Sequence, residues 1–173
     1  MKTLAERIVA RALSQVGYKE GPNNQNKYGE WAGMDHESWC AMFVSWVFSC
    51  EHALGAIAVG THGYAYCPAL LAWAKQRGLL KSIRNISAGD ILLFCWDGSG
   101  VPEHTGIATS TYDPQSHMIL TSEGNTGGQV QGNQTNGDGV YKRVRPASCV
   151  VGVVSLDLAV KYWNKHNPTK EIA

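Results

Sequence analysis

Apolar residues near the start of the chain recur at helical spacing. Leu4, Ile8 and Ala12 lie four residues apart, and further apolar residues adjoin them. Side chains at this spacing share one face of an α-helix. Gly17 follows the series, and glycine is common just past the end of a helix. The pattern predicts an amphipathic helix over residues 3–16.

The stretch from Trp39 to Cys50 is apolar on nearly every side. Only Ser45 and Ser49 interrupt it, and they lie four residues apart. A helix that is apolar all round is typical of a protein interior. The sequence therefore predicts a buried helix over residues 39–50, with Ser38 at its N-cap.

Two other stretches in the first half have clear signals. Residues 21–33 are rich in Gly, Pro and Asn, which is typical of a loop, and we expect an ordered surface loop at the rim of a site. A third helix is predicted from Pro68 to about Gly78, because proline is favoured in a first helical turn and glycine ends helices.

The second half of the chain has strand patterns instead. Short runs rich in β-branched and apolar residues alternate with turn residues, and Asp113 to Ser116 form one such turn. Helices followed by strands predict an α+β domain, in which helices cover one face of an antiparallel sheet. The predicted strands cover residues 91–94, 105–112, 117–122, 140–144 and 150–156.

Length and composition favour one globular domain. The chain has 173 residues, of which 44% are hydrophobic and 17% charged. These values fit a folded domain over residues 1–163, followed by a polar tail or linker start over 164–173. The formal net charge is only +1, so the composition argues against binding to nucleic acid.

Neither a membrane segment nor a cysteine framework is predicted. The chain lacks the run of about 18–20 apolar residues that a membrane span requires, and its first residues do not resemble a signal peptide. We therefore expect synthesis in the cytoplasm without a signal peptide. The five cysteines are widely separated and form no CxxC pair, which argues against a disulfide framework and a zinc ribbon.

Cys40 is the candidate nucleophile. It lies at the start of the predicted buried helix, where unpaired backbone N–H groups and the helix dipole lower the pKa of a thiol. A small buried apolar role is the alternative for any free cysteine. We assign that role to the cysteines without such a position: Cys50, Cys67, Cys95 and Cys149.

His104 is the candidate base. It follows a flexible Gly-rich stretch and begins a predicted strand, so we expect its ring to project from a sheet edge. Gly106 and Ala108 share its face by strand alternation and leave room for a helix, which could be the helix with Cys40. An isolated histidine is more often structural or exposed, and this reading stays open.

Glu123 and Asn125 end the strand that pairs with the strand of His104. They lie two residues apart and are therefore expected on one face of the sheet. A polar acceptor there would orient the imidazole, the third role in a Cys–His site. The alternative is a plain polar transition from strand to loop.

Four segments, in order, resemble the cysteine, histidine-dependent amidohydrolase/peptidase (CHAP) family. This family belongs to the papain-like, NlpC-type cysteine hydrolases that cut peptidoglycan peptides, and phage endolysins and bacterial autolysins are its usual carriers. The resemblance covers most of residues 3–156. The matching segments are Trp39–Trp46, Gly89–Ile91, His104–Ala108 and Glu123–Asn125.

The resemblance implies roles for individual residues. Cys40 would be the nucleophile, His104 the general base and then acid, and Glu123 the residue that orients His104, with Asn125 as further polar support. Trp39 stands where many CHAP domains have Gln, so only the backbone N–H of Cys40 carries over as an oxyanion donor. Two further roles are hypotheses: the Tyr28 hydroxyl as a second donor, and a substrate groove lined by Trp31, Trp39 and Trp96.

The resemblance also implies a function. The chain would be a monomeric hydrolase of bacterial peptidoglycan, cleaving a stem-peptide, cross-bridge or muramoyl–alanine amide, and acting on the wall after release as the catalytic domain of a phage endolysin. No cofactor is implied. Some relatives bind calcium through an Asp-rich loop, but only Asp35, His36 and Glu37 occur here, so no metal is predicted. The alternatives are a bacterial autolysin, a transamidating acyltransferase, and an inactive wall-binding module.

Overall fold

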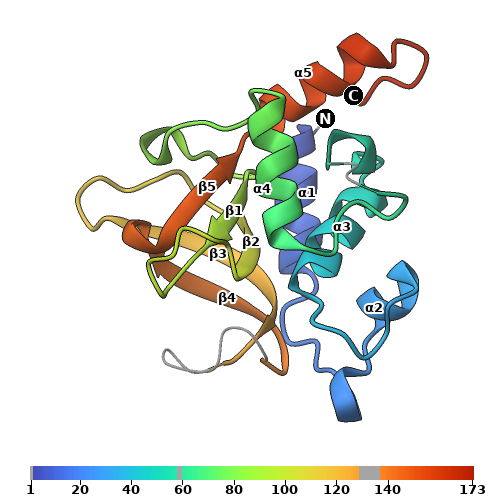
Figure 1. The fold of residues 1–173 in the computed structure, drawn as a ribbon, viewed down its shortest axis with the longest axis vertical. Coiled ribbons are helices and arrows are strands. Elements are labelled where there is room, and N and C mark those ends of the chain that lie inside the picture. Colours follow the sequence, from blue (N-terminus) through green and yellow to red (C-terminus); the bar gives the residue numbers. More distant parts are fainter. Residues whose placement is uncertain (1, 58–59, 129–136) are drawn as a thin grey trace.

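The protein combines helices with one open antiparallel sheet (Figure 1). The computed structural model describes residues 2–57, 60–128 and 137–173. This architecture confirms the predicted α+β class, with four α-helices before the strands and one after them among the described residues. The helices are α1 Leu4–Leu13, α2 Lys27–Ala32, α3 Cys40–Cys50, α4 Cys67–Gln76 and α5 Leu156–His166; the strands are β1 Ile91–Phe94, β2 His104–Ala108, β3 Met118–Thr126, β4 Gly139–Pro146 and β5 Val150–Val154.

The first predicted helix exists but is shorter than 3–16. A capping box sets its start: the Thr3 hydroxyl accepts from the backbone of Glu6, and the Glu6 carboxylate accepts from the backbone of Thr3. The helix ends at Leu13, with Ser14 as its C-cap. Its apolar face is buried against the core, as the spacing predicts.

The expected loop over residues 21–33 contains a helix, α2, so the loop prediction was wrong there. Asn26 caps α2 by accepting from the backbone N–H of Gly29 at 2.7 Å, and Gly33 ends it in a left-handed conformation. A helix of six residues shows too little periodicity to stand out from a Gly- and Asn-rich background.

Helix α3 lies in the interior, as predicted. All but the last two residues and Trp46 are buried. The helix begins at Cys40 with Trp39 as its N-cap residue, and no side chain caps it, so the prediction of Ser38 as the cap was wrong. The first turn of α3 therefore keeps backbone N–H groups that no side-chain cap satisfies.

The sheet has the order β4-β3-β2-β1-β5, so β2 is its middle strand. His104 begins β2 and is fully buried, which corrects the expectation that its ring projects from a sheet edge. Helix α3 lies against β2 and β3. Gly124 permits this approach, because a Cβ at that position would lie 2.6 Å from atoms of Phe43 and Trp39.

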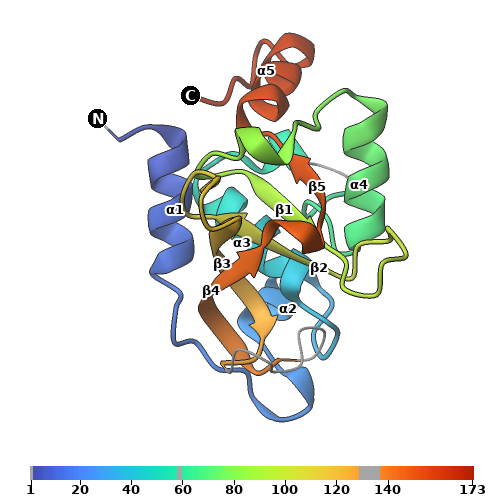
Figure 2. The same ribbon diagram turned by 90° about the vertical axis from the view of Figure 1, so that its left-hand side faces the viewer.

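The C-terminal segment differs from its prediction. Residues from Leu156 form α5, capped by the Ser155 hydroxyl, where the sequence indicated the end of a strand and then a polar tail. The tail folds back on the domain, since Asn164 and Ile172 exchange hydrogen bonds of 3.0 and 2.8 Å and Arg7 donates to Ala173. Figure 2 shows the two termini toward the same end of the molecule as α5.

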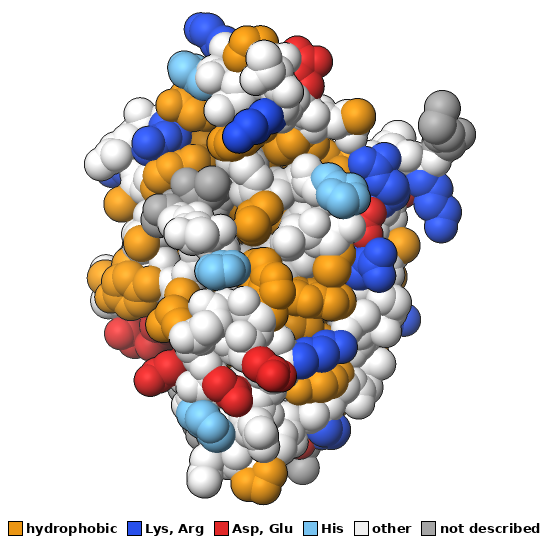
Figure 3. Space-filling view, turned by 90° about the vertical axis from the view of Figure 1, so that its right-hand side faces the viewer, with side chains coloured by type: hydrophobic (Ala, Val, Ile, Leu, Met, Phe, Trp, Pro, Cys, Tyr) orange, Lys and Arg blue, Asp and Glu red, His pale blue; other side chains and the backbone are white. Residues whose placement is uncertain are grey.

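No described helix is long and apolar enough to cross a membrane. Figure 3 shows Lys and Arg side chains gathered near the N-terminal end of the chain. Lys2, Arg7 and Arg11 line a hollow there together with Glu51, whose carboxylate lies 2.8 Å from Arg11. The acidic partner reduces the positive charge of this small patch.

Candidate active site

Cys40 occupies the start of a buried helix, as the sequence predicted. Its side chain is 7% exposed, and it is the first residue of α3. The backbone N–H of Ala41 next to it contributes to lowering the pKa of the Cys40 thiol, which favours the thiolate. The helix start thus places a buried thiol next to backbone N–H donors.

His104 links Cys40 to the sheet. Its Nε2 lies 3.0 Å from Oε2 of Glu123. Its Nδ1 is buried and has no hydrogen-bond partner within the described part of the chain, and interaction with the Cys40 thiol raises the pKa of the ring. The free nitrogen is therefore the one available to the sulfur.

Gly106 explains how Glu123 reaches the ring. A Cβ at Gly106 would lie 2.5 Å from the Cγ of Glu123, so the glycine leaves the space that this side chain occupies. From the sequence, we expected the small residues of β2 to leave room for a helix to pack closely on this strand. At Gly106 the space holds a carboxylate-bearing side chain from β3 instead.

Arg145 on β4 is a site residue that the sequence analysis missed. Its Nε donates to Glu123 Oε1 at 2.9 Å, and its Nη2 donates to Oε2, so the pair is bidentate. The hydroxyl of Thr121 donates to the same carboxylate. Arg145 is 4% exposed, whereas its neighbour Val144 is 55% exposed. The strand has inverted polarity, with its arginine inside and its valine outside, which a hydrophobic pattern does not reveal.

The charges of this cluster shift three pKa values. Burial raises the pKa of Glu123, but hydrogen bonds from Arg145 and His104 outweigh it and lower the pKa to about 2. Burial lowers the pKa of His104, but its bonds to Cys40 and Glu123 raise the pKa to about 9. Hydrogen bonds from Cys67 and then His104 hold the pKa of Cys40 well below its usual range. The shifts of His104 and Cys40 both favour a thiolate beside an imidazolium at neutral pH.

Asn125 contacts the segment at the start of helix α3. With its amide oriented to suit its neighbours, it accepts from the backbone N–H of Trp39 at 3.3 Å and donates to the carbonyl of Gly137 at 2.9 Å. It adopts a left-handed conformation at an irregularity in β3, so strand alternation from Glu123 does not extend to it. Asn125 thus contacts the residue just before Cys40.

The three tryptophans of the expected groove occupy different environments. Trp96 is 38% exposed, lies 5.8 Å from the His104 ring, and stacks under the Arg145 guanidinium. Trp39 is fully buried and donates to Glu20, so it does not line a groove. Trp31 packs edge-on against His62, which lines a surface hollow with Met34 and Tyr64.

The Tyr28 side chain packs inside the domain, and its hydroxyl hydrogen-bonds Gln15. The side chain is fully buried, its ring stacks on Trp39 at 5.2 Å, and the hydrogen bond to Gln15 measures 3.2 Å. The structure therefore gives no support to Tyr28 as an oxyanion donor. The backbone N–H groups at the start of α3 are the donors closest in sequence to the Cys40 sulfur.

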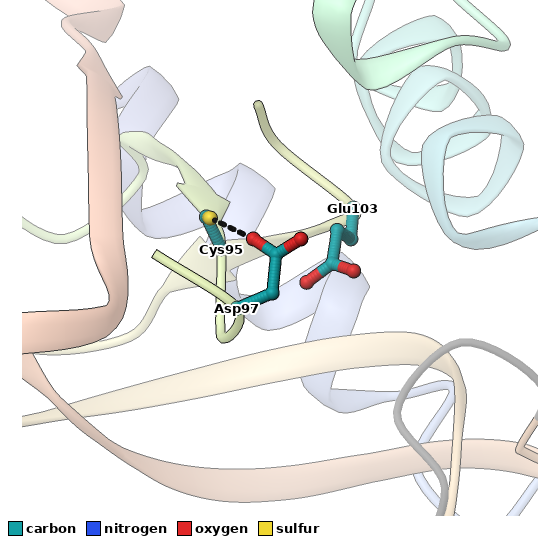
Figure 4. A group of neighbouring side chains, drawn as sticks. All are labelled: Cys95, Asp97 and Glu103. Atoms are coloured by element: carbon teal, nitrogen blue, oxygen red, sulfur yellow. Dashed lines mark hydrogen bonds between the residues drawn. The ribbon is translucent and has the colours of Figure 1, made fainter. Parts of the chain in front are cut away.

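One group of three potential metal ligands occurs among the described residues (Figure 4). Donor atoms of Cys95, Asp97 and Glu103 all lie within 4.8 Å of one another. The Cys95 thiol donates to Asp97 at 3.0 Å, and Glu103 accepts from the backbone of Trp96 at 3.1 Å. These hydrogen bonds account for the cluster without a cation.

Comparison with known proteins shows a shared fold. No protein-family model and no curated protein matches the chain. Among solved structures, the crystal structure of Ly7917 is similar, with a TM-score of 0.51 and 15% identity over 88% of this chain and 62% of that one. The structure of Ly7917 with the hydrolyzing product of MDP has a TM-score of 0.49 and 16% identity, and the match covers 87% of this chain and 62% of that one. The chain thus spans less than two thirds of Ly7917, and the similarity shows the fold alone.

Proposed function

We propose that the protein is a peptidoglycan hydrolase that cleaves an amide bond by a Cys–His thiol mechanism. The observation that carries this proposal is the buried series Cys40, His104, Glu123: the His104 Nε2 lies 3.0 Å from Glu123 Oε2, and the interaction between His104 and Cys40 raises the pKa of the imidazole and lowers the pKa of the thiol. A nucleophile, a base and an orienting acid in this relation are the elements of covalent amide hydrolysis. The CHAP resemblance supports peptidoglycan as the substrate class.

The first half of the reaction forms a thioester. The Cys40 sulfur attacks the amide carbonyl carbon, and the C=O electron pair moves to the oxygen, where backbone N–H groups at the start of α3 stabilise it. As the oxyanion collapses, the C–N bond breaks and the His104 imidazolium transfers its proton to the leaving amine. The acyl group stays on Cys40.

The second half restores the enzyme. Neutral His104 takes a proton from water, and the resulting hydroxide attacks the thioester carbon. The C–S bond breaks, the carboxylic acid leaves, and Cys40 returns as the thiolate beside the imidazolium. Glu123 accepts from Nε2 throughout and keeps Nδ1 directed at the sulfur.

The surface around the site favours an extended substrate. Trp96 is half-exposed above the histidine and offers an aromatic face next to the reacting atoms. A hollow lined by Met34, His62 and Tyr64 lies along the segment that leads to Cys67. In this proposal the chain acts as the catalytic domain of a phage endolysin, made in the cytoplasm and active on the wall after release.

Defined peptidoglycan tests the proposal. Cys40→Ala and His104→Ala should each lower fragment release by about 10⁴-fold or more, the scale seen when a catalytic triad loses a member. His117→Ala is the matched control, because His117 is exposed. Within the part of the chain that the structure describes, its side chain hydrogen-bonds only the Tyr112 hydroxyl. Circular dichroism checks the fold of each variant.

Mass spectrometry of the products in ¹⁸O-labelled water identifies the reaction. Hydrolysis places one labelled oxygen in the new carboxyl group, whereas transamidation joins the acyl group to an amine without the label. A folded Cys40→Ala variant that releases fragments at the wild-type rate would overturn the nucleophile. A wild-type protein that binds walls but releases nothing would instead support the inactive wall-binding module.

A further inference from the structure

A second cysteine stands beside the proposed nucleophile. Helices α3 and α4 both begin with a cysteine, Cys40 and Cys67, and the interaction between the two thiols is the largest cause of the pKa shift of each. Both are nearly buried, with exposed fractions of 7% and 5%. The mechanism above uses only Cys40, so Cys67 has no part in the acyl chemistry.

Hydrogen bonds hold the segment before Cys67 against the site. The Ser45 hydroxyl donates to the Tyr64 carbonyl at 2.9 Å and accepts from the Tyr64 backbone N–H at 3.0 Å. The Tyr64 hydroxyl lies 2.9 Å from the hydroxyl of Thr105, the residue after His104. The segment is thus fixed both to the helix of the nucleophile and to the strand of the histidine.

The fit of this segment is also sterically close. A Cβ at Gly63 would lie 2.5 Å from the Ser45 hydroxyl, and Gly63 has a positive φ of 78°. Only glycine combines that conformation with that approach. The position of Cys67 therefore follows from a fitted contact between the segment and α3.

The two thiols are chemically unequal. Cys40 has His104 and the backbone of Ala41 as partners that stabilise its thiolate, and these partners are not available to Cys67. The hydrogen bond to the Cys40 sulfur and burial raise the pKa of Cys67 well above its usual range. A thiolate next to a neutral thiol is the arrangement in which the first sulfur reacts and the second resolves the product.

We propose that Cys67 is a resolving thiol, and that peroxide converts Cys40 and Cys67 into a reversible disulfide that stops the enzyme. The inference rests on the proposed function, since it treats Cys40 as the nucleophile. In this state Cys40 has no free sulfur to attack an amide. A thiol reductant returns both side chains and the activity.

The atoms and electrons balance in two steps. The Cys40 thiolate attacks one oxygen of hydrogen peroxide, the O–O bond breaks, and the sulfur becomes a sulfenic acid while the other oxygen leaves as water after taking a proton. The Cys67 sulfur then attacks the Cys40 sulfur. The S–O bond breaks, the S–S bond forms, and the oxygen leaves as a second water. Two thiols are oxidised and one peroxide is reduced.

Intact mass and peptide mapping test the inference directly. The wild-type protein, treated with peroxide near one equivalent, should lose the mass of two hydrogens, and its map should show a peptide that joins Cys40 to Cys67. Lytic activity should be lost in parallel and regained with dithiothreitol. Each activity is compared with that of the same protein before oxidation.

Cys67→Ser separates the resolving role from the presence of a thiol. This variant is close in size, and its Cys40 should proceed to higher oxygen adducts, so that dithiothreitol no longer restores activity. Cys50→Ser is the matched control: Cys50 ends the same helix, α3, and this variant should form and reduce the disulfide as the wild type does. Cys67→Ala repeats the comparison if the serine variant does not fold.

Two results would overturn the inference. One is an oxidised wild-type protein in which Cys67 remains a free thiol. The other is equal recovery of the wild type and Cys67→Ser after reduction. Mapping reads the disulfide without reference to lysis, so a mapped disulfide in a protein that never cleaves peptidoglycan would refute the proposed function and leave the thiol pair established.

Discussion

Glu123 connects two charged residues that lie far apart in sequence. It accepts from the His104 ring on one side and from the Arg145 guanidinium on the other, and all three are buried. A buried carboxylate keeps its charge only where such partners offset its desolvation. Glu123 therefore serves the stability of the fold as well as the orientation of the histidine.

We predict that Glu123→Gln loses both functions. Turnover should fall by about 10⁴-fold, because a neutral amide neither stabilises the imidazolium nor selects its tautomer. The free energy of unfolding should fall by about 3–5 kcal/mol, because the Arg145 guanidinium stays buried without its carboxylate. Urea unfolding and single-turnover kinetics measure the two effects.

Glu103→Gln is the control for this substitution. Glu103 is exposed and accepts only the Trp96 backbone N–H among its recorded hydrogen bonds, so the same change should shift the unfolding midpoint little. A Glu123→Gln protein with wild-type stability would show that Arg145 does not depend on this carboxylate.

The candidate site could be predicted from the sequence only in part. Cys40, His104 and Glu123 stand in short segments with a recognisable order, and the structure brings these three together. Arg145 and Cys67 carry no local signal. Each reaches the site through a contact between distant segments, which hydrophobic spacing along the chain does not encode.

At the scale of elements, the contact between α3 and β3 sets the geometry of the site. Helix α3 carries Cys40 and β3 carries Glu123, and Gly124 lies where the two elements meet. The nearest atoms to a Cβ at Gly124 belong to Phe43 and Trp39, at 2.6 Å. One is the Cβ of Phe43, which moves only with the helix.

We predict that Gly124→Ala separates these elements. The methyl group must displace α3 from the sheet, which should cost about 1–3 kcal/mol of stability and lower kcat by moving Cys40 from His104. Gly21→Ala is the control, because a Cβ there meets its nearest atom at 3.4 Å and the backbone φ is negative. Wild-type kcat in Gly124→Ala would show that the site tolerates a shift of the helix.

The elements also show which patterns a sequence reveals. Helix α3 and the strands were predicted because long apolar or β-branched runs mark them. Helix α2 was missed because its six residues, one of them Gly29, are too few to show the repeated apolar spacing of a helix. Helix α5 was missed because only Ser155 separates the apolar residues of β5 from Leu156. One polar residue between apolar residues also fits the alternation of a strand, so the sequence did not show where the strand ends.

At the scale of the molecule, the site lies where the two halves of the chain meet. The helical half supplies Cys40 and Cys67, and the strand half supplies His104, Glu123 and Arg145. Neither half holds a complete site. The α+β class could be predicted because helical patterns come before strand patterns, but the packing of one half on the other is what joins the nucleophile to its base.

The pH dependence of the whole enzyme should follow the Cys40–His104 pair. The reaction needs the thiolate and the imidazolium together, so activity should rise as Cys40 loses its proton, well below the usual thiol pKa, and fall as His104 loses its proton near pH 9. The net charge of +1 gives no strong competing effect on binding to the wall. A profile of kcat/KM against pH on a soluble fragment should therefore be bell-shaped and high at neutral pH.

Alkylation separates this pair from other titrating groups. Iodoacetamide should modify Cys40 of the wild type at a rate that stays high below pH 7, whereas a free thiol with a pKa of about 8.5 slows tenfold for each unit of falling pH. In His104→Ala the interaction with Cys67 remains but the imidazolium is absent, so the pKa of Cys40 should rise and the rate below neutral pH should fall relative to the wild type. Equal alkylation profiles in the two proteins would show that His104 does not hold the thiolate, and the alkaline limb of the activity profile would then need another acid.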